Sequence, residues 1–233
     1  MDPQSPLRTS GAVRRFTSEP VSDAAIHQLL DDARFAPSGG NRQPWRVAVV
    51  KDVARRGRLA ELMQPVWDAY VARGALGITP YNSVDDIEPD EVPHAPNELL
   101  DQIETVPVVL AVAADLRKIA LMDGGLERPA ITGGASIYPF CWSILLSARD
   151  RGLGGVITTF LSRVEPEAGP ELGLLEHHAL AATIFLGVPE FQATKLRRGE
   201  VGDFTTVDRF DGEPFMPAAF PEAQRLRAAR ADH

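Results

Sequence analysis

Apolar residues near the start of the chain recur at helical spacing. The stripe that shows this consists of Ile26, Leu29, Leu30 and Ala33. Ser22 precedes the stripe and can cap a helix, and Pro37 follows it and disfavours continuation. The pattern therefore predicts an amphipathic helix that begins after Ser22 and ends before Pro37.

A wider apolar stripe lies between residues 134 and 151. Its members are Ile137, Phe140, Cys141, Ile144, Leu145 and Ala148. A stripe of this width is typical of a helix that is buried on most sides, and Gly152 can cap its carboxyl end. We therefore expect a central helix here.

Four further segments have the composition of strands, namely residues 45–50, 108–114, 156–160 and 179–186. The second of them is apolar throughout and does not alternate, which predicts a strand covered on both faces. A turn and a short helix around residues 165–174 separate the last two. The sequence thus predicts a sheet flanked by helices and leaves its strand order open.

The region between the first two strands is less regular. Residues 55–73 have a helical pattern that Pro65 interrupts. Residues 74–107 are rich in proline, aspartate and glutamate, with one short helical patch at 97–103. A loop of this length is usually functional or mobile. We expect residues 74–107, with Trp67, Tyr70 and Tyr81 in or just before them, to form a variable lid or a surface covering for a dimer.

Composition limits the function classes. The 233 residues fit one large domain or at most two small ones, and we expect a single domain with a tail at 216–233. The formal net charge of -8 argues against a nucleic-acid partner. The longest apolar run, 106–114, is far shorter than the ~20 residues of a membrane helix, so no membrane partner is expected.

The single cysteine, Cys141, excludes an intrachain disulfide and suits a reducing compartment, so we expect a cytoplasmic protein. Its place on the central apolar stripe favours a packed core thiol over a nucleophile. Arg14, Arg15 and Phe16 are followed by Thr-Ser-Glu-Pro at 17–20 instead of the apolar segment of an export signal, so the N-terminus is expected to belong to the mature protein.

Several familiar sites are absent from the sequence: a phosphate-binding P-loop, a His-Glu-x-x-His motif, a Gly-x-Ser-x-Gly motif and a dinucleotide fingerprint. His177 and His178 are neighbours in the sequence, just before the strand predicted at 179–186. In extended backbone their side chains would point to opposite faces, so no metal site is expected. What remains is a dispersed set of cations and glycine-rich turns. These are Arg14 and Arg15, the loop 37–41, the turn 152–155, and Lys195 with Arg197 and Arg198.

In combination, these segments resemble the FMN-dependent nitroreductase family. The resemblance rests on Ala-Val-Arg-Arg-Phe at 12–16, on Ala-Pro-Ser-Gly-Gly-Asn-Arg-Gln-Pro-Trp at 36–45, on the helix end and glycine turn at 148–155, and on the basic segment 194–198. It spans about residues 8–215, and the string at 36–45 is its most specific part. It implies an α+β fold with a mixed sheet sandwiched by helices. It also implies an intertwined homodimer with FMN at the subunit interface.

The resemblance also implies roles for individual residues. Lys195 and Arg197 match phosphate contacts, and Arg14 matches a cation near N1 and the C2 carbonyl of the flavin. Gly154 and Gly155 suit a close backbone approach to flavin N5.

In the other loop, Ser38 and Asn41, with Pro37 and Gly39 beside them, match residues that touch the ring or the ribityl chain, often from the partner subunit. Gln43, Pro44 and Trp45 are expected to pack at the strand entry rather than contact the flavin.

The sequence departs from the family pattern at the start of the chain and at Ser143, which stands where an asparagine is frequent. The usual start, Arg-x-Ser-x-Arg, is replaced here by Ser10, Ala12 and Arg14, so one cation and one hydroxyl are missing. Arg8, Ser10 or Arg198 are the candidates for compensation.

The expected reaction is a two-step cycle in which NAD(P)H donates hydride to flavin N5 and an electron-poor acceptor, such as a nitroaromatic or a quinone, is then reduced. No side chain needs to act as an acid or base in the first step. Three alternatives remain open. They are a flavin oxidase or dehydrogenase that does not use NAD(P)H, a non-catalytic flavin-binding or flavin-free dimer, and a scaffold that binds a partner through the acidic stretch 85–91.

Overall fold

The computed structural model describes residues 5–215, which form two compact units. The larger unit comprises residues 10–192. The smaller unit combines residues 5–9 with the segment that begins at Ala193. The predicted tail at 216–233 lies outside the described residues.

The larger unit is built on a four-stranded sheet in the order β1-β2-β4-β3. The strands are β1 (Trp45–Val49), β2 (Val108–Asp115), β3 (Gly154–Thr158) and β4 (His178–Gly187). All three strand pairs are antiparallel, and a parallel bridge joins Ala12 to Gly155 at the β3 edge. The four predicted strands and the α+β class are thus confirmed, with ends shifted by one or two residues.

Strand β2 is buried along its whole length and separates two hydrophobic clusters. Val108, Leu110 and Val112 point to one face, and Val109 and Ala111 point to the other. Because successive side chains of a strand alternate between faces, a strand buried on both sides is apolar at consecutive positions, as residues 108–114 are here. This confirms the prediction of a strand that is covered on both faces.

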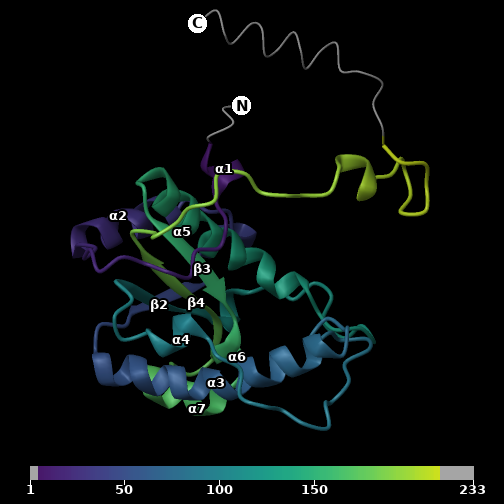
Figure 1. Cartoon of the computed structure of the whole chain (residues 1–233). Helices are drawn as coiled ribbons and strands as arrows, with labels where there is room; N and C mark the ends of the chain where they lie inside the picture. The colour runs from purple at the N-terminus through teal and green to yellow at the C-terminus, as the bar shows by residue number, and fades with distance from the viewer. Residues whose placement is uncertain (1–4, 216–233) are drawn as a thin grey trace, which may run out of the picture. The chain divides into compact units, whose positions relative to one another are not determined.

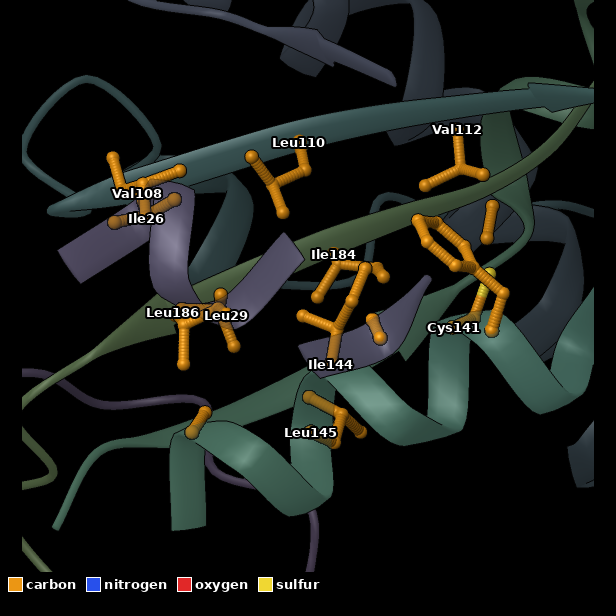
Figure 2. Close-up of a cluster of buried hydrophobic side chains, with 14 of the residues drawn as sticks. Ile26, Leu29, Val108, Leu110, Val112, Cys141, Ile144, Leu145, Ile184 and Leu186 are labelled. Atoms are coloured by element: carbon orange, nitrogen blue, oxygen red, sulfur yellow. The ribbon is translucent and has the colours of Figure 1, made fainter. Parts of the chain in front are cut away.

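Helices α2 (Asp23–Ala33) and α5 (Tyr138–Asp150) cover the first face (Figure 1). Ser22 caps α2 by accepting a hydrogen bond from the backbone N–H of Ala25, as predicted. Figure 2 shows side chains of α2 and α5, such as Leu29 and Ile144, packed against β2 and β4. Gly152, with φ 77°, follows α5 in the left-handed conformation expected of a helix-ending glycine.

Four helices cover the second face, namely α3 (Val53–Ala75), α4 (Glu98–Asp101), α6 (Phe160–Arg163) and α7 (Glu165–Leu172). Helix α3 runs through Pro65, so the predicted interruption is wrong. Proline removes one helical hydrogen bond, but Met63 and Val66 on either side are buried, and their packing holds the helix together. Among the described residues, no helix is long and apolar enough to cross a bilayer.

The smaller unit has little regular structure. It contains the short helix α1 (Pro6–Thr9) and a turn of 3₁₀-helix at Val201–Asp203. Glu200 and Asp203 each accept a hydrogen bond from the other's backbone N–H, which forms a capping box around that turn.

Candidate functional site

A cavity of about 540 Å³ opens in the larger unit, on the face of the sheet covered by α3. Its wall comes from four segments that are far apart in the sequence, namely Arg14, Trp67 with Tyr70, residues 96–99 and residues 156–160. The strand β3 ends and α6 begins at this wall, so residues from a loop, from the three helices α3, α4 and α6, and from a strand end converge here.

Three aromatic rings form one side of the cavity. Trp67 and Tyr70 are stacked on α3, with centroids 5.8 Å apart and ring planes 10° apart. Phe160 lies against both, at 5.9 Å and 6.2 Å. The indole Nε1 of Trp67 donates a hydrogen bond to the carbonyl of Pro96 at 3.2 Å, which fixes the ring against the opposite segment. Such a wall suits a flat apolar ligand.

Two polar residues of the cavity lining have side chains without a hydrogen-bond partner among residues 5–215. Arg14 is exposed, and its guanidinium forms no hydrogen bond or ion pair with any residue of the described chain. The hydroxyl of Thr158 is buried and has no hydrogen-bond partner among residues 5–215. Buried polar groups are nearly always paired, so this hydroxyl is unusual, but its oxygen has almost no exposed surface and does not open onto the cavity.

The backbone explains why Arg14 lies at this cavity. Ala12 forms a parallel bridge with Gly155, and the N–H of Val13 donates to the carbonyl of Gly155 at 2.9 Å. The N-terminal segment therefore runs along the edge of β3. The next residue, Arg14, lies beside the C-terminal half of that strand, where Thr158 is found.

Gly154 and Gly155 begin β3 and are buried. A Cβ atom on Gly155 would lie 2.6 Å from the carbonyl oxygen of Phe185 and would also clash with Leu186. A Cβ atom on Gly154 would lie 2.7 Å from the side chain of Val13. Protein packing alone therefore requires glycine at both positions, and their contact with flavin N5 stays a prediction.

Ser10 lies with these two glycines at a void of only about 10 Å³, which is too small for a ring. The cavity floor is formed further along the strand, by residues 156–158. Sequence reasoning missed Thr158 and Phe160 as candidates. No motif marks them, because their importance follows from which atoms remain unpaired or exposed after folding.

The loop from Pro37 to Asn41 has a fixed and unusual backbone. Gly40 and Asn41 have φ of 59° and 52°, a left-handed conformation that glycine and asparagine adopt most readily. The Ser38 hydroxyl accepts a hydrogen bond from the N–H of Gln43 at 3.0 Å. The N–H of Gly39 donates to the Ser136 hydroxyl at 3.0 Å. None of the loop residues lines the cavity that contains Arg14.

Trp45 follows this loop and stacks on Phe140 of α5, with centroids 4.6 Å apart and ring planes 6° apart. The expected packing role of the strand entry is therefore confirmed for Trp45.

Lys195 and Arg197 belong to the smaller unit. Both side chains are exposed, and neither forms a hydrogen bond or ion pair with a residue of the described part. The backbone carbonyl of Arg197 accepts a hydrogen bond from Arg198 at 2.6 Å. Two neighbouring free cations fit the predicted contact with a phosphate, and their convergence with Arg14 stays a prediction.

The segment 74–107 is anchored by a buried cation. Arg73, which is 2% exposed, pairs with Asp86 at 2.9 Å and with Glu88 at 2.5 Å. The ring of Tyr81 lies between the guanidinium groups of Arg73 and Arg163, at 4.3 Å and 4.6 Å. Two carboxylates of the acidic stretch 85–91 are thus partly neutralised within the chain. The end of the segment, residues 96–99, forms the cavity wall.

The remaining candidates have structural explanations. Burial raises the pKa of the Cys141 thiol to about 12, which confirms a packed core thiol. The imidazole Nδ1 of His178 lies 2.9 Å from the carbonyl of Glu176. In the described residues, no three histidine, cysteine or acidic side chains are grouped so that they could hold a metal ion.

Comparison with known proteins identifies relatives of this chain. The model of the Nitroreductase family matches residues 8–188. A protein named NADH dehydrogenase from Thermus thermophilus is 30% identical over 186 residues, which cover 76% of this chain and 82% of that protein. Iodotyrosine deiodinase 1 from Rattus norvegicus is 25% identical over 189 residues, which cover 78% of this chain and 60% of that protein.

Among solved structures, the NADPH:FMN oxidoreductase from Vibrio harveyi, complexed with NAD+, has a similar fold. The TM-score is 0.62, and the match covers 97% of this chain and 84% of that one. With 17% sequence identity, this likeness concerns the fold.

Proposed function

The chain belongs to the nitroreductase family of oxidoreductases, and from this premise we propose that it is an FMN-dependent enzyme. It passes hydride from NAD(P)H through the flavin to an electron-poor acceptor such as a nitroaromatic or a quinone. The observation that supports this most directly is the cavity beside β3, whose lining combines three aromatic rings with Arg14, a cation that has no ion pair or hydrogen bond within residues 5–215.

The cavity residues fit a flavin ring, which has apolar faces and a polar edge. When bound, FMN supplies the reversible acceptance of hydride. Arg14 would lie near the edge of the ring where negative charge collects on reduction, and the cation favours that charge. Trp67, Tyr70 and Phe160 would exclude water and hold a flat acceptor parallel to the ring.

The position of the loop 37–41 supports the proposal of a homodimer. Its residues resemble flavin contacts, yet they do not line the cavity of their own chain. A second copy of the chain would bring its loop, with Ser38 and Asn41, to the flavin of the first. We therefore propose a homodimer that binds FMN at the subunit interface. Its substrate is a small-molecule electron acceptor.

Phosphate binding is assigned to the smaller unit. A flavin phosphate carries close to two negative charges, and each charge-assisted hydrogen bond contributes about 1.5–3 kcal/mol. Lys195 and Arg197 have exposed side chains without described partners. They are therefore available to the phosphate.

Titration of the purified protein with FMN, followed by quenching of flavin fluorescence, tests this assignment. The double variant Lys195→Ala and Arg197→Ala should raise the Kd for FMN at least about tenfold, since two charged contacts are lost. The matched control is Arg209→Ala, an exposed arginine of the same unit that is paired with Asp211. An unchanged Kd in the double variant would remove the phosphate assignment.

A second candidate function is a flavin oxidase or dehydrogenase, in which an organic substrate rather than NAD(P)H gives hydride to the flavin. It is kept because the relatives of this chain include iodotyrosine deiodinase 1, whose name mentions no nicotinamide nucleotide. A protein whose bound FMN reacts with neither NADH nor NADPH, while an organic substrate reduces it, would support this candidate over the first.

A further inference from the structure

The last part of the segment 74–107 is held against α3 by side chains on one face of that helix. Gln64, Trp67 and Asp68 stand three and four residues apart, so they lie on the same side of α3. The indole of Trp67 donates a hydrogen bond to the carbonyl of Pro96. Gln64 and Asp68 bind the residue before it, Ala95.

Ala95 is bound at both of its backbone polar groups. Its N–H donates to Oδ1 of Asp68 at 2.9 Å, and its carbonyl accepts from Nε2 of Gln64 at 2.8 Å. The Gln64 amide donates its second hydrogen to the same carboxylate oxygen at 2.6 Å. A carbonyl and an ionised carboxylate only accept, so the amide nitrogen has to face both of them. Two side chains thus hold Ala95 as a neighbouring strand would.

The sequence around Ala95 leaves few other means of fixing this stretch. Pro93 and Pro96 have no N–H, so only His94 and Ala95 can donate from the backbone between residues 93 and 96. A residue before proline favours extended backbone, so Ala95 is also kept out of a helix. Its hydrogen bonds to α3 therefore determine where this part of the chain lies.

Asp68 is well placed for this role, because only 16% of its side chain is exposed. Burial raises the pKa of Asp68, but the hydrogen bonds from Ala95 and Gln64 outweigh burial and leave that pKa below its ordinary value. The carboxylate is therefore ionised, and an ionised acceptor forms the stronger hydrogen bonds. The imidazole Nδ1 of His94, a mostly exposed side chain, lies 3.5 Å from the same oxygen.

These contacts bear on the candidate site, although Asp68 itself does not line the cavity. Residues 96–99, which follow directly after Ala95, form part of the cavity wall. Trp67 and Tyr70, on the same helix as Asp68, line the cavity as well. A shift of Ala95 away from α3 would therefore move one part of the wall relative to the aromatic rings.

We infer that Asp68 is a positioning residue: through Ala95 it fixes the wall residues 96–99 relative to the aromatic rings of α3, and it thereby selects acceptors by size. The inference rests on the proposed function for the kind of ligand that is selected. A one-ring acceptor needs both parts of the wall for its orientation. A two-ring acceptor keeps its contact with the aromatic rings when residues 96–99 move, so loss of Asp68 penalises the smaller acceptor more.

Hydrogen–deuterium exchange of the flavin-free protein measures the hold on the wall. In Asp68→Ala, exchange in the peptide that covers residues 91–97 should become at least about tenfold faster, because the N–H of Ala95 loses its acceptor. Asp68→Asn keeps an acceptor oxygen and should retain most of the protection. The matched control is Glu61→Ala, which removes the other carboxylate of α3 and should exchange as the wild type does. Unchanged exchange in β2 shows that each variant stays folded.

Steady-state kinetics with 1,4-benzoquinone and 2-methyl-1,4-naphthoquinone measures the selection by size. In Asp68→Ala, the KM for benzoquinone should rise about three- to fivefold relative to the KM for the naphthoquinone. Asp68→Asn should restore the ratio. A smaller folded fraction would lower kcat for both quinones equally, so the KM ratio separates positioning from stability.

The inference is overturned if residues 91–97 of Asp68→Ala exchange at the wild-type rate, or if the KM ratio does not change. It is also overturned if Asp68→Asn loses protection as Asp68→Ala does, because the acceptor oxygen would then not be the cause. A wild type that reduces neither quinone would count against the proposed function. The exchange measurement needs neither flavin nor acceptor, so it would still decide whether Asp68 holds the wall.

Discussion

The guanidinium of Arg15 forms a bidentate ion pair with the carboxylate of Glu98, 83 residues further along the chain, through contacts of 2.5 Å and 2.6 Å. Glu98 begins α4 and lines the cavity, and Arg15 follows directly after Arg14. The hydrogen bonds from Arg15 lower the pKa of Glu98 from its ordinary value, so the carboxylate stays ionised. The pair thus joins two walls of the proposed active site and places a negative charge near Arg14.

Replacing Glu98 by Gln should change which acceptors the enzyme prefers. The substitution removes a negative charge at the cavity and frees the charge of Arg15. The KM for 4-nitrobenzoate should therefore fall about two- to fivefold relative to that for neutral 4-nitrobenzamide. Glu61→Gln is the matched control, because Glu61 pairs with Arg58 and does not line the cavity. Equal effects of Glu98→Gln on both acceptors would refute this electrostatic role.

A Gly155→Ala substitution should destabilise the protein in the absence of flavin. The new methyl group would lie 2.6 Å from the carbonyl oxygen of Phe185, and overpacking of this kind costs about 1–3 kcal/mol of unfolding free energy. Urea denaturation of the flavin-free protein measures the change. In the control, Gly74→Ala in α3, the nearest atom would be 3.9 Å away, so no loss is expected. Normal stability with impaired FMN binding would instead restore Gly155 as a flavin contact.

The Cys141 thiol should be unreactive in the folded protein. Burial raises its pKa to about 12, so the thiolate that reacts with disulfide reagents is scarce at pH 8, and the side chain is enclosed. Ellman's reagent should modify it only in urea. Rapid stoichiometric modification of the native protein at pH 8 would show that α5 is less tightly packed than the structure indicates.

Acid should weaken the contribution of Asp115 to the free energy of unfolding, over the pH range between its ordinary pKa and its lowered pKa. A hydrogen bond from Arg117 lowers the pKa of Asp115 to about 2, whereas the unfolded chain binds this proton near the ordinary value of 3.8. The ionised carboxylate therefore stabilises the fold fully above the ordinary pKa, and this contribution is lost as the pH falls towards 2.

Urea denaturation between pH 5 and pH 2 checks this sign. The difference in unfolding free energy between wild type and Asp115→Asn should shrink as the pH falls. Asp85→Asn, at an exposed residue without a described ion pair, should show no such convergence. A difference that stays constant with pH would contradict the role of the Arg117 contact.

Much of the fold could be predicted from residues that begin or end helices and from runs of apolar residues. Ser22 and Pro37 delimit α2, and the unbroken apolar run before Ala114 predicts a strand covered on both faces. The interruption predicted at Pro65 was wrong, because tertiary packing of α3 outweighs a single lost hydrogen bond.

The candidate site was less predictable, because its residues come from distant parts of the sequence and lie together only once the sheet and its helices have formed. The contact of Phe160 with Trp67 depends on where β3 ends relative to α3. Thr158 became a candidate because its hydroxyl has no partner after folding, a property that no sequence motif encodes. In the same way, the sequence could not decide whether Gly155 is required by a ligand or by its neighbours in the core.

The central claim is that bound FMN carries hydride from NAD(P)H to an acceptor, and anaerobic stopped-flow spectroscopy tests it most directly. The protein is loaded with FMN and mixed with NADH or NADPH, and the blue absorption band of the flavin is followed. The account predicts bleaching by at least one nucleotide and recovery of the band when a quinone or nitroaromatic is added. A bound flavin that dithionite reduces but neither nucleotide bleaches would contradict it.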